Sequence, residues 1–194
     1  MRIILTSIFS LAIFCGASLA THAEEWPAYP KSLPQFQYEG DALKQAWPKL
    51  SAITGAEYPD EAWIQRTLAK YPLLNEKVKE LSQLESSHPA VQALKNNDYT
   101  PLATALQDIW RLHFSGNFQQ AYIKGAELTS LGMIPAVYSR LMNASLLIKD
   151  DEERMNAFKA IQSLSEAGLE LLPGYFFGEF GLAFAKARML EMMS

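Results

Sequence analysis

The chain has 194 residues, a formal net charge of −4 and a single cysteine. This length fits one domain with a core of its own. The acidic balance argues against a nucleic-acid-binding protein, which needs a basic face. The cysteine, Cys15, lies in the apolar N-terminal stretch. The rest of the chain therefore excludes disulfides, thiol catalysis and cysteine-based zinc sites.

The N-terminus predicts a cleavable secretion signal. Arg2 is followed by a nearly uninterrupted apolar stretch over 3–20, and Ala23 closes a small-residue cleavage site. A cut after Ala20 and a retained membrane anchor are the alternatives, although a membrane span needs about 20 apolar residues. We expect residues 1–23 to be removed and the protein to be exported, with the bacterial periplasm as the expected compartment.

Residues 24–38 predict an extended arm instead of a helix. Three prolines lie within this segment, and each fixes the backbone angle φ and removes a hydrogen-bond donor. The aromatic side chains either pack along a helical body or dock on a partner, and packing is the interpretation we favour. The aromatic residues of the arm are Trp26, Tyr29, Phe36 and Tyr38.

From residue 39 onward the chain predicts helices alone, so we expect a single all-helical domain over 39–194. Apolar residues recur every three or four positions, and no hairpin pattern is present. In the first half we expect helices from Asp41 to about Ile53, from Pro59-Asp60 to Pro72, over 75–86, and from Pro89 to about 97.

The second half predicts longer helices with clearer starts. Thr100-Pro101 resembles a cap followed by proline at the first helical position, and Asp150 with Glu153 resembles a capping box. The expected helices run from Pro101 to a turn at 115–117, from Phe118 to Gly132, from Pro135 to about Leu147, over 151–172, and from about Tyr175 to Met192.

A repeat pattern is visible over residues 100–172. Pro101 and Pro135 stand 34 residues apart, and each is expected to open a helix that is followed by a turn and a second helix. In this spacing the segment resembles tetratricopeptide repeats. The resemblance implies helical hairpins stacked into an α-solenoid, with a plain helical bundle as the alternative. The matching turn residues are Gly116, Asn117, Phe118 and Ala121.

The resemblance implies protein or peptide binding in a concave groove along the first helix of each pair. At the matching positions, Trp110 is suited to stacking on a peptide side chain and His113 to hydrogen bonding, with core packing as the alternative. The partner-binding residues that we expect are Leu106, Trp110, His113, Phe114 and Arg140.

We expect no catalytic residue, no metal site and no cofactor. After removal of the signal, the two histidines are His88 and His113, and neither has a carboxylate at metal-ligand spacing. Glu179 is flanked by aromatic residues, which would raise the pKa of an enclosed carboxyl group, but an outward-pointing side chain is the simpler interpretation.

The last predicted helix is apolar on more than one face. A helical array normally ends with a polar outer face. This helix is therefore either buried centrally, in contact with another subunit, or part of a site for an apolar ligand. The residues proposed for such a contact are Tyr175, Phe176, Phe177, Phe180 and Phe184.

These patterns predict an exported helical-repeat protein that binds a protein or peptide as an adaptor or scaffold. We also expect that the protein can self-associate through its C-terminal helix. We expect neither nucleic-acid binding nor a membrane span after removal of the signal. A helical protein of the cell envelope that binds a small apolar ligand is the alternative. A helical hydrolase is the least supported.

Overall fold

The computed structural model describes residues 25–52 and 55–193, and all regular secondary structure within these ranges is helical. The predicted all-α class is confirmed. The expected signal at 1–23 and the expected helix end at Ile53 lie outside the described residues. The helices are α1 (Ala42–Leu50), α2 (Glu61–Lys70), α3 (Pro72–Ser82), α4 (Pro89–Gln92), the 3-10 helix η1 (Ala93–Asn96), α5 (Thr100–Phe114), α6 (Phe118–Glu127), α7 (Thr129–Leu146), α8 (Asp151–Leu171) and α9 (Phe176–Met193).

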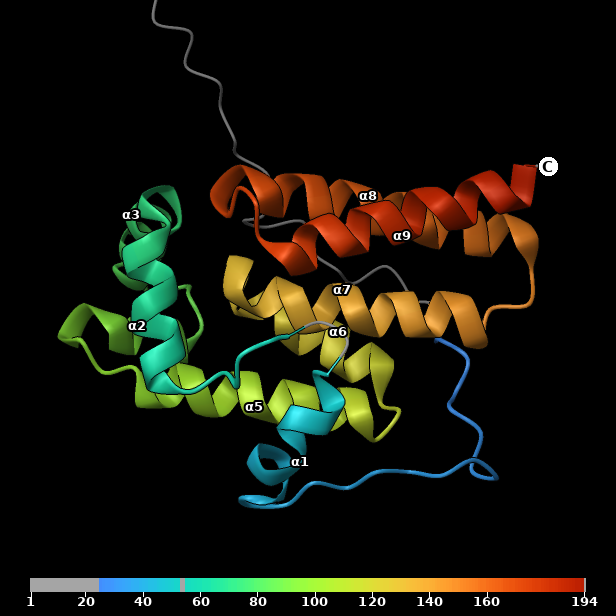
Figure 1. Cartoon of the computed structure of the whole chain (residues 1–194). Coiled ribbons are helices and arrows are strands. Elements are labelled where there is room, and N and C mark those ends of the chain that lie inside the picture. The colour runs from blue at the N-terminus through green and yellow to red at the C-terminus, as the bar shows by residue number, and fades with distance from the viewer. Residues whose placement is uncertain (1–24, 53–54, 194) are drawn as a thin grey trace, which may run out of the picture.

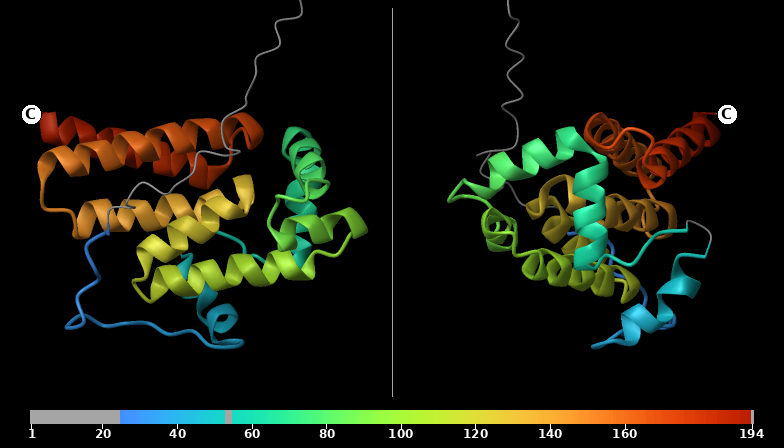
Figure 2. Two further views of the ribbon diagram at one scale, coloured as in Figure 1. Left: turned by 180° about the vertical axis from the view of Figure 1, so that it is seen from behind. Right: turned by 60° about the vertical axis from the view of Figure 1, so that its left-hand side comes forward.

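The helices pack in sequential antiparallel contacts. In Figure 1, α5, α7 and the α8–α9 pair form successive layers, and α6 lies against both α5 and α7. Helices α2 and α3 stand at one end of these layers, and α1 lies across α5 together with the extended arm at 25–40. Figure 2 shows α9 at the edge of the stack in both additional views. One side of α9 therefore faces α7 and α8, and the other side is left outside.

The buried apolar side chains form three groups. The largest joins α2–α5 to the start of α7, and the second joins α7, α8 and α9 around Phe158 and Ile161. The third is smaller and consists of Leu43, Trp47 and Trp110, which attach α1 to α5. Because the α7–α9 layer has a core of its own, the position of α9 does not depend on contacts along its outer face.

One predicted break in the chain is wrong. Helix α6 already ends at Glu127, and α7 runs from Thr129 straight through Gly132 and Pro135. Gly132 lies where α6 and α7 cross, since a Cβ atom added to it would come within 2.2 Å of the carbonyl oxygen of Gly125. The physical reason for this glycine is thus close backbone packing between two helices, and not helix termination.

This correction bears on the 34-residue spacing. Pro101 lies in the first turn of α5, whereas Pro135 lies inside α7, so the two prolines do not open equivalent helices. The predicted turn is present: Gly116 has a positive φ of 83°, which glycine adopts without strain. Phe118 and Ala121 are buried behind it. The relation to tetratricopeptide repeats stays a prediction.

Three other boundaries differ from expectation. Helix α3 starts at Pro72 itself, because proline is well accepted at the first helical position. Thr100 is likewise the first residue of α5 and not its cap; its N–H donates to Asp98 Oδ1 over 3.2 Å. Helix α1 ends at Leu50, two residues after Pro48.

The start of α2 offers a matched test of helix capping. Asp60 Oδ1 accepts a hydrogen bond from the N–H of Trp63 at 2.9 Å, whereas Asp41, which precedes α1, makes no such bond. We expect Asp60→Ala to lower the free energy of unfolding by about 1 kcal/mol and Asp41→Ala to change it little. Urea unfolding of the two variants measures this difference, and equal losses would contradict it.

Candidate functional site

The predicted groove residues on α5 lie in the interior. Leu106 is buried, and Trp110 and His113 are 7% and 8% exposed. The indole of Trp110 meets Trp47 of α1 edge-on, with ring centres 5.4 Å apart, and stacks on Phe114 at 5.6 Å. Helix α1 thus covers the face of α5 on which the family resemblance places a peptide.

The arm covers the two remaining predicted groove residues. The guanidinium carbon of Arg140 lies 4.1 Å from the ring centre of Trp26, and Tyr38 meets the ring of Phe114 edge-on at 5.8 Å. Cation–π and aromatic contacts of this kind contribute about 0.5–1.5 kcal/mol each. Phe36 is the exposed aromatic residue of the arm. The arm thus lies against the side chains of Phe114 and Arg140, which are both half-buried.

A further arm residue lies on the turn that carries the family resemblance. The ring of Tyr29 covers Gly116 so closely that an added Cβ atom would lie 2.6 Å from its Cγ. The same ring meets Phe118 edge-on at 5.8 Å. Because Gly116 has no side chain, it can adopt the positive φ of the turn and also leave room for the ring of Tyr29.

His113 and Ser139 form a buried polar pair between α5 and α7. His113 Nδ1 lies 3.0 Å from Ser139 Oγ, and this hydroxyl donates to the carbonyl of Pro135 at 2.7 Å. Because the serine proton is used on Pro135, the imidazole Nδ1–H is the donor to Ser139. Burial lowers the pKa of His113 to about 4, so the ring is neutral at pH 7. Both side chains are enclosed, and we interpret the pair as a structural hydrogen bond.

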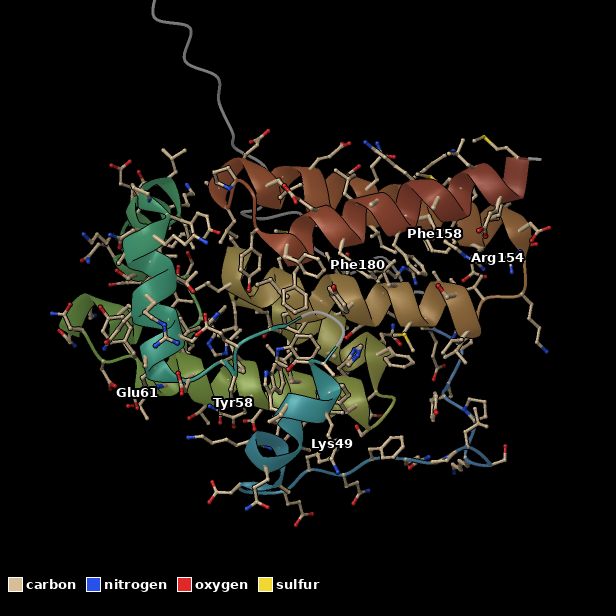
Figure 3. All side chains as sticks on the ribbon, in the orientation of Figure 1. Lys49, Tyr58, Glu61, Arg154, Phe158 and Phe180 are labelled. Atoms are coloured by element: carbon tan, nitrogen blue, oxygen red, sulfur yellow. The ribbon has the colours of Figure 1, made fainter. Side chains whose placement is uncertain are left out.

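The outer face of α9 carries an exposed apolar stripe. Phe176 is 47% and Leu190 64% exposed. Phe180 is half-buried at the border of this face toward α7, as Figure 3 shows, and its ring stacks on that of Tyr138 at 6.0 Å. The stripe residues follow one another at intervals of four, three, four and three, which keeps them on one side of a helix. We call Phe176, Phe180, Ala183, Ala187 and Leu190 the α9 stripe.

The remaining predicted residues of the C-terminal segment do not share this face. Phe177 is buried, with its ring centre 5.1 Å from that of Tyr138. Tyr175 is half-buried and meets Tyr71 edge-on at 6.2 Å, and Phe184 is half-buried beside the stripe. The five aromatic residues proposed from sequence are thus divided between an inner and an outer side of the helix.

Glu179, the acidic residue flanked by aromatic residues in the sequence, has an exposed side chain. It lies one position before Phe180, and Lys186 lies in the same way one position before Ala187. Both charged side chains therefore flank the α9 stripe on the same side. Lys186 also forms an exposed ion pair with Glu166 of α8, at 3.4 Å.

Sequence reasoning did not single out Tyr138 of α7 and Ser165 of α8. Their hydroxyl oxygens are buried and have no hydrogen-bond partner. A tyrosine and a serine at helical positions carry no local pattern that distinguishes them from satisfied residues. Only the packing of α7, α8 and α9 encloses the two hydroxyls.

The described ranges 25–52 and 55–193 hold no group of three or more histidine, cysteine, aspartate or glutamate residues that could bind a metal ion. Within the same ranges, no helix combines the length and apolar character that a membrane crossing requires. Comparison with protein-family models, curated proteins and solved structures finds no match to this chain.

Proposed function

We propose that this protein acts by binding protein, as a scaffold and not as an enzyme, and that α9 is the binding surface. The observation that carries the proposal is the α9 stripe, an apolar seam on the helix at the edge of the stack. A helix at the surface of a stack usually carries polar residues on its outer side. The predicted groove is a weaker candidate, because α1 and the arm cover it.

The partner that this surface fits is a second copy of the chain. The α9 stripe has the heptad spacing of a helix-pairing seam. If two α9 helices pair antiparallel with Phe180 opposite the second copy's Ala183, then Phe176 comes opposite its Ala187. Each large side chain meets a small one, and a two-fold axis repeats every contact.

The charges that flank the α9 stripe fit the same register. Glu179 and Lys186 each directly precede a residue of the α9 stripe, Phe180 and Ala187 respectively. In an antiparallel helix pair, residues at these preceding positions face each other across the interface. Each Glu179 then lies opposite the second copy's Lys186, twice per dimer. The exposed ion pair between Lys186 and Glu166 contributes little that would oppose this arrangement.

We also propose that the scaffold works outside the cytoplasm, in the bacterial periplasm. The support for this compartment is the predicted signal over 1–23, together with the absence of cysteine after it. A protein of this kind needs neither a cofactor nor a metal ion.

Self-association is tested by sedimentation equilibrium of the purified protein over a range of concentrations. We expect a monomer–dimer equilibrium for the natural chain and at least a tenfold higher dissociation constant for Ala183→Glu, which places a charge in the apolar seam. Ala160→Glu, the same change at an exposed position of α8, is the matched control and should leave the equilibrium unchanged. A natural chain that stays monomeric at about 1 mM would overturn the pairing.

Charge exchange tests the register. Glu179→Lys and Lys186→Glu each place like charges opposite one another in a homodimer, so each variant alone should dimerise less than the natural chain. An equimolar mixture of the two should form the heterodimer preferentially, because both flanking pairs are then attractive. Native mass spectrometry counts the three species. A statistical mixture would contradict the antiparallel register.

A further inference from the structure

Trp26 anchors the beginning of the arm to the helices. Its ring centre lies 5.1 Å from that of Tyr122 of α6 and 4.1 Å from the guanidinium carbon of Arg140 of α7. Its backbone N–H donates to Gln119 Oε1 at 3.2 Å. Among aromatic side chains, tryptophan interacts most favourably with a cation over its face. This part of the surface is therefore suited to a tryptophan in an extended segment of chain.

The second anchor is Tyr29, three residues further along the arm. Its ring lies against Gly116 and meets Phe118 of α6 edge-on at 5.8 Å. A proline directly follows each anchor, at positions 27 and 30. In a polyproline-type chain, residues three apart lie on the same side, and this spacing agrees with the contact of both rings with α6. The residues that receive the two rings, which we call the arm seat, are Gly116, Phe118, Tyr122 and Arg140.

The arm is attached to the helices in two separate places. Both anchors are half-buried, whereas residues 30–37, which follow them, are all exposed. Beyond this exposed stretch, Arg111 of α5 donates to the carbonyl oxygens of Tyr38 and Gly40, at 2.8 and 2.9 Å. Release of the two anchors therefore empties the arm seat without breaking the attachment to α5.

We propose that the arm seat recognises an extended peptide segment with the pattern aromatic–proline–x–aromatic, and that the chain's own arm occupies it as a tethered competitor. A partner protein that presents such a segment binds by taking the place of residues 26–29. Proline-rich segments dock well on aromatic surfaces, because their backbone is already extended before binding. The site is independent of pairing through α9, since the arm lies with α1 across α5 and α9 lies at the edge of the stack (Figure 1).

The test uses a synthetic peptide of residues 25–34, labelled at its C-terminus and followed by fluorescence anisotropy. The receiving protein is the full chain with Trp26→Ala and Tyr29→Ala, which empties the arm seat and keeps its residues. We expect this double variant to bind the peptide at least tenfold more tightly than the natural chain, in which the tethered arm competes. Phe36→Ala changes an exposed arm residue outside the seat. It is the control and should bind the peptide no better than the natural chain.

Changes in the seat and in the peptide test its chemistry. In the double variant, Arg140→Met should weaken peptide binding at least fivefold and Arg140→Lys less, because lysine keeps the positive charge. A peptide with alanine in place of its tryptophan should lose at least as much. Trp26→Ala alone is a second receiving protein, with an affinity between those of the natural chain and the double variant. Equal affinities of the natural chain and the double variant, or binding that Arg140→Met leaves intact, would overturn the proposal.

Displacement is measured on the natural chain itself. With the chain labelled with nitrogen-15 and the peptide unlabelled, an excess of peptide should move the amide signal of Trp26, whose N–H bonds to Gln119. A Trp26 signal that stays in place while the signals of other residues shift would show that the peptide binds elsewhere. It would overturn the competition between arm and partner. Absence of binding to the double variant at about 1 mM peptide would show that the arm is a structural clamp alone.

Discussion

Lowering the pH from 7 to 4 is expected to reduce the free energy of unfolding by roughly 3 kcal/mol through His113 alone. Burial lowers the pKa of this imidazole from 6.5 to about 4 in the folded chain. Between these two values the unfolded chain takes up a proton and the folded chain does not, so acid favours unfolding. The contribution of His113 is complete above pH 6.5 and is lost as the pH falls to about 4.

Urea unfolding at several pH values between 7 and 4 isolates this effect when the natural chain is compared with His113→Gln. The glutamine is neutral throughout, so the variant should start less stable at pH 7 and lose less stability with acid. The stability of each chain at pH 7 serves as the reference for its own loss with acid. The same dependence in His113→Gln would mean that His113 is not the group responsible.

Gly132→Ala is expected to destabilise the protein by about 3 kcal/mol, the upper end of the cost of overpacking a core. The added Cβ atom would lie 2.2 Å from the carbonyl oxygen of Gly125. Because that oxygen belongs to the backbone of α6, relief requires the two helices to move apart. Alanine favours a helix over glycine by about 1 kcal/mol, so a net loss measures the crossing and not helix propensity.

Gly178→Ala is the matched control for this variant. Gly178 is also a helical glycine, but a Cβ atom added to it would meet only the side chain of Leu169, with Cδ2 the closest at 2.9 Å, and a flexible side chain can turn away. We expect its stability to stay within about 1 kcal/mol of the natural chain. If Gly132→Ala is as stable as Gly178→Ala in urea unfolding, then α6 and α7 do not cross at this distance.

Much of the helical architecture follows from local sequence. Apolar spacing of three and four residues is enough to predict helices from residue 39 onward, and the start of α8 follows from Asp150, whose Oδ1 accepts from the N–H of Glu153 at 2.8 Å. The α6–α7 boundary does not follow, because Gly132 and Pro135 look like a helix end when read locally. The role of Gly132 is decided by the packing of α6 against α7, where Gly132 lies against Gly125, and an apolar spacing pattern carries no information on that approach.

The candidate sites were less predictable for the same physical reason. Spacing places Trp110 and His113 on one helix face, but it gives no information that Trp47 covers that face. The sequence places the aromatic residues of the C-terminal segment in one group, and only the packed helices separate the outward Phe176 from the buried Phe177. The unpaired hydroxyl of Ser165 depends on its surroundings in three helices.

The docking of the arm also sets an order for folding. The N–H of Trp26 donates to Gln119 Oε1 across 93 residues of sequence, and Arg111 holds the carbonyl of Tyr38 across 73. Most contacts among α5, α6, α7, α8 and α9 join neighbours along the chain, and such local contacts form faster than distant ones. The binding place of the arm thus exists only after the helices have assembled. We therefore expect the first described residues to leave the ribosome to be the last to reach their final position.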